Sequence, residues 1–287
     1  MLRYILAALG VVILAGAVIW FTVSPLTIFN TIVPKDSGSE RVARISTGES
    51  ERQGFDIYAP VDASAGDNLP VIVFFHGGGW RDGAHQHYAW AGRALAAQGV
   101  VAVMAGYRLT PEVEWPAFQE DGVAAVRGVR RAVAQYGGDP DRLFLAGHSA
   151  GAQIAALLAL DENWLGEDRA AVAGWIGVSG PYDFLPLDSP RTIAAFSNAD
   201  PLEATQPLVF AGEGDPPALL LHGSTDDTVN PRKSVDMAAK LEAAGVSVTH
   251  IVYDGVGHIN IITALARWGR DSAPTLRDMA AFARDTR

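Results

Sequence analysis

Short apolar runs alternate with helical patterns along most of the chain. Uninterrupted apolar runs bounded by glycine or polar residues predict buried strands at residues 71–75, 100–105, 143–146, 172–178, 219–223 and 248–252. Longer stretches predict helices at residues 118–136, 152–160, 231–244 and 273–284. This alternation is typical of a mostly parallel central sheet flanked by helices. We therefore expect an α/β fold.

The first apolar run differs from the others in length. Residues 4–23 carry no charged side chain, and as a helix they are long enough to cross about 30 Å of hydrocarbon. Arg3 precedes this run and no further positive charge occurs before Lys35, so we expect the rest of the chain outside the cytoplasm, in the periplasm of a bacterium. The alternative is secretion after signal-peptide cleavage, because residues 15–17 are Ala-Gly-Ala, which resembles a cleavage site.

These patterns predict three parts of the chain. Residues 1–24 form the N-terminal membrane anchor, residues 25–49 a linker and juxtamembrane segment, and residues 50–287 a single folded domain. Between about residues 185 and 217 the periodicity is weak, and proline, aspartate and glycine are frequent. We expect this stretch to form a lid or small cap over a site at one edge of the sheet.

Composition excludes several classes of function. The chain of 287 residues has 22 basic and 32 acidic side chains and a net charge of −10, which argues against nucleic acid or an anionic lipid surface as a partner. It has no cysteine, so disulfides and thiol chemistry are excluded. His85 and His87 form a His-x-His pair, but no carboxylate–histidine pattern accompanies them. We expect neither a metal nor a cofactor.

The sequence Gly-His-Ser-Ala-Gly at residues 147–151 carries the first chemical signal. It joins a predicted strand to a predicted helix and fits the Gly-x-Ser-x-Gly pattern of a nucleophile elbow. At such a turn the serine adopts a strained backbone conformation that exposes its hydroxyl, and the flanking glycines leave room for close chain approach. We therefore predict Ser149 as a nucleophile.

A glycine-rich segment, His-Gly-Gly-Gly-Trp at residues 76–80, follows the predicted strand 71–75. Consecutive glycines leave backbone N–H groups uncovered, so these groups are able to converge on an oxyanion. The expected donors are the amides of Gly78 and Gly79, together with the amide of Ala150 directly after the predicted nucleophile. Trp80 is expected to serve packing.

Seven histidines are candidates for the general base. His148 sits on the elbow itself and should point away from the site, whereas His76 and His222 lie where apolar runs meet glycine and should make structural hydrogen bonds. His250 lies inside a predicted strand. His258 follows a strand within the loop Asp-Gly-Val-Gly-His, where catalytic groups of a parallel sheet are expected. His258 is therefore the predicted base.

A carboxylate is needed to orient that imidazole. Asp226 lies in a loop after a predicted buried strand and is our first candidate, with its neighbour Asp227 and the more distant Asp183 as alternatives. Ser149, Asp226 and His258 then occur in the chain order Ser, Asp, His, which is the order of α/β-hydrolases.

Together these motifs resemble the α/β-hydrolase esterases and lipases related to hormone-sensitive lipase. His-Gly-Gly-x-Trp is similar to the branch that contains feruloyl-esterase-like and kynurenine-formamidase-like proteins. Further matches are Tyr107-Arg108-Leu109, Trp115-Pro116-Ala117, the segment 138–142 and the segment 222–226. The resemblance covers roughly residues 50–285, and it implies a triad of Ser149, Asp226 and His258 with an oxyanion hole at Gly78, Gly79 and Ala150.

The resemblance implies hydrolysis of a small-molecule carboxylic ester, with small to medium acyl chains, through an acyl-enzyme on Ser149. An amide-directed hydrolase, either a formamidase or a peptidase with the same triad, is the alternative. A non-catalytic binding module of the same fold is a third possibility. Relatives of the lipase type usually carry a longer N-terminal cap than this chain has, so the acyl pocket does not transfer from the resemblance.

Overall fold

The computed structural model describes residues 25–286. The chain divides into two compact units with a boundary between residues 33 and 34. The described part of the first unit contains helix α2 (Pro25–Ile32). The predicted membrane span at residues 4–23 lies outside the described residues. Within residues 25–286, no helix has the length and apolar character needed to cross a membrane.

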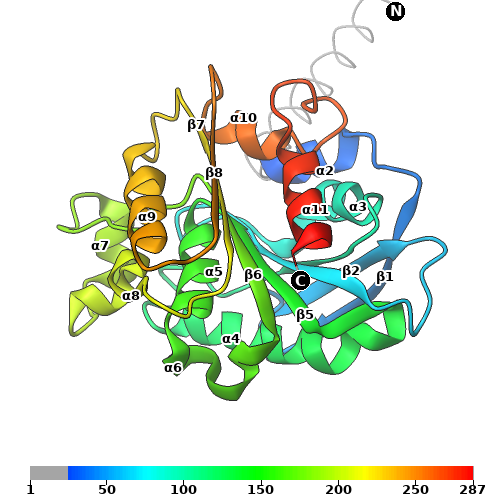
Figure 1. Ribbon diagram of the computed structural model, residues 1–287, viewed down its shortest axis with the longest axis horizontal. Coiled ribbons are helices and arrows are strands. Elements are labelled where there is room, and N and C mark those ends of the chain that lie inside the picture. The colour runs from blue at the N-terminus through cyan, green and yellow to red at the C-terminus, as the bar shows by residue number, and fades with distance from the viewer. Residues whose placement is uncertain (1–24, 287) are drawn as a thin grey trace, which may run out of the picture. The chain divides into compact units, whose positions relative to one another are not determined.

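The second unit is built on an eight-stranded sheet (Figure 1). In spatial order its strands are β1 (Ser39–Ser46), β2 (Gly54–Pro60), β4 (Val101–Ala105), β3 (Leu69–Phe75), β5 (Gly138–His148), β6 (Val172–Val178), β7 (Ala218–Gly223) and β8 (Val248–Tyr253). The first two strands pair antiparallel, as do β2 and β4, and all later neighbours are parallel. The predicted α/β fold is confirmed, and the parallel strands all end at one edge of the sheet.

Helices cover both faces of this sheet. On one face lie α4 (Ala117–Ala132), α5 (Ala150–Leu160) and α9 (Arg232–Ala243), and on the other lie α3 (Ala89–Ala96) and α11 (Thr275–Asp285). Shorter helices are α6 (Glu162–Leu165), α7 (Pro190–Phe196), α8 (Pro207–Phe210) and α10 (His258–Thr263). Four 3₁₀ segments span His85–Tyr88, Val133–Tyr136, Gly166–Ala171 and Leu202–Thr205.

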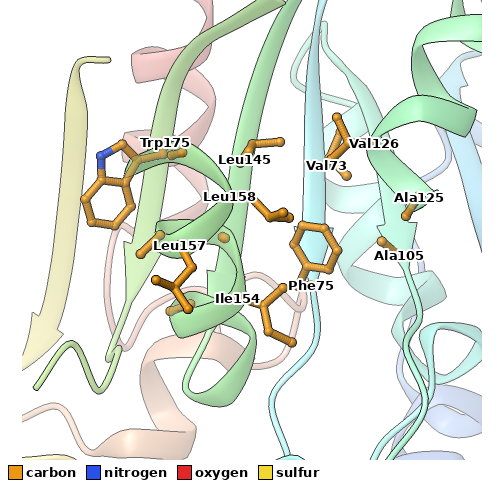
Figure 2. Packing of buried hydrophobic residues seen from close by; sticks show 14 of the residues in the cluster. Val73, Phe75, Ala105, Ala125, Val126, Leu145, Ile154, Leu157, Leu158 and Trp175 are labelled. Atoms are coloured by element: carbon orange, nitrogen blue, oxygen red, sulfur yellow. The ribbon is translucent and has the colours of Figure 1, made fainter. Parts of the chain in front are cut away.

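Helix α5 is buried along its whole length, because it lies between the sheet and α4. Its leucine and isoleucine side chains pack beside Phe75 of β3 and Leu145 of β5 (Figure 2). Successive strand residues point to opposite faces, so Phe75 and Leu145 belong to this core while Phe74 and Phe144 face the other side. The uniformly apolar α5 thus fixes where the chain leaves β5.

The edge strand β1 and its neighbour β2 were not predicted. Residues 39–46 lie in the stretch predicted as linker, yet they pair with β2 in the sheet. The apolar pattern is broken here by an ion pair: Asp56 of β2 is fully buried, and Arg44 of β1 contacts its carboxylate through two hydrogen bonds of 2.6 and 2.7 Å. The folded domain therefore begins before residue 50.

The Arg44–Asp56 pair predicts the effect of removing its cation. Replacing Arg44 by methionine leaves a buried carboxylate whose remaining cation, Arg41, lies 3.7 Å away, so we expect a loss of about 2 kcal/mol or more in unfolding free energy. Arg41→Met is the matched control, and it should cost less than about 1 kcal/mol because its 3.7 Å contact with Asp56 is longer and, within residues 25–286, includes no hydrogen bond. Urea unfolding of both variants measures the difference, and equal losses would contradict it.

Candidate active site

Ser149 occupies the strained turn that its sequence motif predicts. It lies between β5 and α5 with φ 54° and ψ −122°, and its amide donates to the carbonyl of Val178 at 2.9 Å. A Cβ at Gly147 would collide with the carbonyl of Gly151, and one at Gly151 would collide with the carbonyl of Phe75. Glycine is therefore required at both positions for the helix to start this close to the strands.

The segment His76–Trp80, here called the oxyanion loop, follows β3 at the same edge. Gly78, Gly79 and Trp80 have φ values of 129°, 58° and 55°, and the carbonyl of Gly78 accepts the amide of Asp82 at 3.0 Å. Within residues 25–286, the amides of Gly78, Gly79 and Ala150 donate no hydrogen bond. These N–H groups are thus available to an acceptor that enters the site.

The oxyanion loop, the elbow and the histidine loop lie against one another. A Cβ at Gly77 would lie 3.2 Å from the Cβ of Ser149 and 2.8 Å from Nδ1 of His148. Nε2 of His148 donates to the carbonyl of His258 at 3.0 Å, and the two imidazole rings lie 4.7 Å apart. His148 therefore ties the elbow to the segment that carries His258, and the orientation of its ring away from the substrate stays a prediction.

The structure brings His258 and Asp226 into direct contact. Nδ1 of His258, at the start of α10, donates to Oδ2 of Asp226 at 2.7 Å. The other carboxylate oxygen of Asp226 accepts the amides of Thr228 and Val229 at 3.0 and 2.9 Å. With its proton on Nδ1, the imidazole presents an unprotonated Nε2.

A direct contact between Ser149 and His258 stays a prediction. In the described part of the chain, the hydroxyl of Ser149 makes no hydrogen bond. Catalytic hydrogen bonds are often long before substrate binds and shorten in the complex. The other two alternatives for the carboxylate lie elsewhere: Asp227 is exposed and accepts from Thr228 at 3.3 Å, and Asp183 pairs with Lys233 at 3.7 Å.

His222 contributes to the site in a way that the sequence analysis missed. Its Nε2 donates to the carbonyl of Val229 at 3.0 Å, the structural hydrogen bond that was expected, but it also lies 3.3 Å from Oδ2 of Asp226. Burial raises the pKa of Asp226, and hydrogen bonds from His222, His258 and the Val229 amide outweigh it and hold that pKa well below its usual range. The sequence signal for this contact is the spacing of four residues between His222, near the end of β7, and Asp226 in the loop that follows.

Of the remaining histidines, His76 is part of the oxyanion loop and His85 lies outside it. His76 is buried between Tyr88 and Tyr107, and its Nδ1 donates to the carbonyl of Gly77 at 2.8 Å, so it supports the oxyanion loop. His85 lies in the 3₁₀ segment beside β2. Within residues 25–286, no group of three or more possible ligands is arranged to hold a metal ion.

Trp80 anchors the oxyanion loop through a buried amide. Its indole N–H donates to Oε1 of Gln153 at 3.1 Å, and Nε2 of Gln153 donates to the carbonyl of Thr205 at 3.0 Å. Its ring also packs against Phe184 and Phe196, with centroids 5.7 and 4.8 Å away. Gln153 therefore joins three elements: the loop, helix α5 and the segment 185–217, here called the cap segment.

The sheet order, the elbow and the loop geometry define an α/β-hydrolase domain. Residues 55–241 match the BD-FAE family, which is more than half of the chain, so the chain belongs to the BD-FAE family. The resemblance to α/β-hydrolase esterases is thus confirmed. The family match ends before His258, which is placed at the site by its hydrogen bond to Asp226.

Individual relatives carry esterase names. The chain is 30% identical over 260 residues to a probable isoprenylcysteine alpha-carbonyl methylesterase, ICMEL1, of Oryza sativa subsp. japonica, covering 81% of this chain and 61% of the relative. It is 48% identical over 96 residues to the carboxylesterase NlhH of Mycobacterium tuberculosis, covering 32% and 30% of the two chains. The solved structure of the carboxylesterase EstE1, from a metagenomic library, has a TM-score of 0.77 at 22% identity, covering 91% of this chain and 93% of its own.

The chain spans about three fifths of the length of the rice relative. The likeness to EstE1 shows the fold.

The Gln153 bridge predicts a specific loss of stability. Gln153→Met leaves a buried indole N–H and the Thr205 carbonyl unpaired, so we expect about 1–3 kcal/mol less unfolding free energy and faster amide hydrogen exchange in the oxyanion loop. Gln119→Met is the matched control: Gln119 is also fully buried, and it donates at 3.2 Å to a carbonyl of α5, away from the loop. If the control accelerates exchange in the loop equally, Gln153 is not its anchor.

Buried neutral histidines predict acid sensitivity. Burial lowers the pKa of both His76 and His148 to about 3, below their usual value near 6.5. The unfolded chain therefore binds more protons than the folded chain between about pH 6.5 and 3. As the pH is lowered through that window, the free energy of unfolding should decrease by roughly 1.4 kcal/mol per pH unit for each histidine. Urea unfolding at pH 7 and pH 4.5 measures this slope. A flat profile would contradict it.

Proposed function

We propose that this protein is a serine hydrolase that cleaves carboxylic esters through an acyl-enzyme on Ser149. The observation that carries the proposal is the 2.7 Å hydrogen bond between His258 and the buried carboxylate of Asp226, formed beside a strained elbow serine. An imidazole held in this tautomer is able to take a proton from a serine hydroxyl. The esterase names of several relatives support an ester as the substrate.

The reaction proceeds in two acyl transfers. Nε2 of His258 takes the proton of the Ser149 hydroxyl as its oxygen attacks the ester carbonyl, and the negative charge of Asp226 stabilises the resulting imidazolium. The amides of Gly78, Gly79 and Ala150 stabilise the oxyanion, and the imidazolium then protonates the leaving alcohol. Water, deprotonated by the same histidine, releases the acid and restores the serine.

Two further features belong to this proposal. Small to medium acyl chains are the proposed substrates, because the ring of Phe196, the last residue of α7, packs edge-on against Trp80 of the oxyanion loop with centroids 4.8 Å apart and occupies space beside the proposed oxyanion donors. The N-terminal run of residues 4–23 is proposed as a membrane anchor that holds the catalytic domain outside the cytoplasm, on the basis of its length and flanking charge.

Removal of the nucleophile tests the proposal. Ser149→Ala should lower kcat on p-nitrophenyl esters by roughly 10⁴- to 10⁶-fold, as in other triads, and abolish covalent labelling by a fluorophosphonate. Ser179→Ala is the matched control, because Ser179 is another buried serine at a strand end with φ 49°. Activity retained by Ser149→Ala would refute the nucleophile, and activity confined to formamides or peptides would favour the amide-directed alternative.

A further inference from the structure

Arg191 of the cap segment lies on the oxyanion loop. A Cβ at Gly79 would lie 2.8 Å from Nη1 and 2.9 Å from Cδ of Arg191, so the stem and the guanidinium both rest against the backbone of Gly79. Gly79 is a predicted oxyanion donor. The guanidinium of Arg191, although more than half exposed, therefore stands next to a predicted oxyanion donor.

The backbone of Arg191 is held firmly. It is the second residue of α7, whose start is closed by hydrogen bonds in both directions between Ser189 and Thr192. At the other end, Phe196 is fully buried and the carbonyl of Ala195 accepts the amide of Trp115 at 2.9 Å. The guanidinium consequently projects from a well-anchored helix.

Stability of the fold gives no reason for a cation at this position. In the first turn of α7 a positive side chain opposes the partial positive charge of the helix N-terminus. In the part of the chain that the structure describes, its one ion pair joins Nη2 to Asp82 at 3.4 Å, with both side chains more than half exposed, and such pairs contribute about 0–1 kcal/mol. Within residues 25–286, Nη1 and Nε of Arg191 donate no hydrogen bond.

We propose that Arg191 binds a carboxylate carried by the ester substrate, so that the protein prefers monoesters of dicarboxylic acids over neutral esters of the same length. This inference rests on the proposed esterase function. The net charge of −10 repels anionic substrates at long range, so a carboxylate-bearing ester needs a local cation at the site. Arginine supplies two parallel N–H donors that match the geometry of a carboxylate.

Distances set the length of the substrate. A carbonyl oxygen bound by the amide of Gly79 lies no more than about 8 Å from Nη1, given standard bond lengths and an N–H···O distance of about 2.9 Å. A carboxylate separated from the ester carbonyl by three or four methylenes lies roughly 5 to 6.5 Å from it in an extended chain. This distance is an upper bound, and after about 2.9 Å is allowed for the hydrogen bond to the guanidinium, glutarate and adipate monoesters are long enough to reach from the oxyanion donors to Arg191.

The test compares two p-nitrophenyl esters with the same six-carbon acyl chain. The adipate monoester carries a carboxylate where the hexanoate ester carries a methyl group, and spontaneous hydrolysis is subtracted with Ser149→Ala. We expect Arg191→Gln to lower the adipate-to-hexanoate ratio of kcat/KM by about ten- to a hundredfold, mainly by raising KM for adipate. Asp82→Asn should raise this ratio, because Asp82 competes for the guanidinium.

The control is Arg277→Gln, which removes the same charge from an exposed position on α11 and should leave the ratio unchanged. If Arg191→Gln leaves the adipate-to-hexanoate ratio of kcat/KM unchanged, including the case in which kcat/KM falls by the same factor for both esters, carboxylate recognition is overturned. The esterase proposal stays intact in that case. Absence of hydrolysis of either ester by the intact protein instead counts against the esterase proposal. In that case calorimetric binding of monomethyl adipate to Ser149→Ala, with and without Arg191→Gln, still decides whether Arg191 binds the carboxylate.

Discussion

The close approach between the start of α5 and the ends of β3 and β5 is the constraint on which the site depends. A side chain at Gly147 or Gly151 would collide with backbone carbonyls, so the helix starts there only because both residues lack a Cβ. This approach places Ser149 at a positive φ, and among the described residues the amide of Ala150 has no acceptor. It also brings the oxyanion loop, which leaves β3 at the same level, against the elbow. One backbone geometry thereby positions Ser149, the predicted nucleophile, beside the amides that are predicted to bind the oxyanion.

Around this backbone geometry, buried histidines connect the loops of the site to one another. His148 joins the elbow to the carbonyl of His258, and His222 contacts both the Asp226 carboxylate and the backbone that follows it. A proton on His148 would be buried next to His258, which is why burial and the neighbouring imidazole lower its pKa. The one charge that persists in this cluster is the Asp226 carboxylate, and several N–H groups are directed at it. These N–H groups lower the pKa of Asp226 and keep its carboxylate charged.

Much of this architecture follows from the sequence, for physical reasons that also explain the failures. Parallel strands buried on both faces read as unbroken apolar runs, and residues 172–178 were predicted with the bounds of β6. The buried Asp56 broke that pattern in β2, so the edge of the sheet was missed. Motifs with fixed backbone requirements located Ser149 and the oxyanion loop. Contacts between distant segments, such as Trp80 with Gln153 or Arg191 with Gly79, leave no local periodicity and emerged only in three dimensions.

The attachment of the cap segment to the oxyanion loop links specificity to catalysis. Two buried links of the cap segment meet at Trp80, the residue directly after Gly79. Thr205 is connected to Trp80 through Gln153, and Phe196 packs against the Trp80 ring. A change in the cap segment that served only to reshape a binding surface would therefore also move the predicted oxyanion donors. Arg191, which rests on Gly79 itself, lies at the point where these two functions meet. The same link reaches the elbow, because Gln153 stands on α5 and its backbone amide donates to the carbonyl of Ser149 at 3.3 Å.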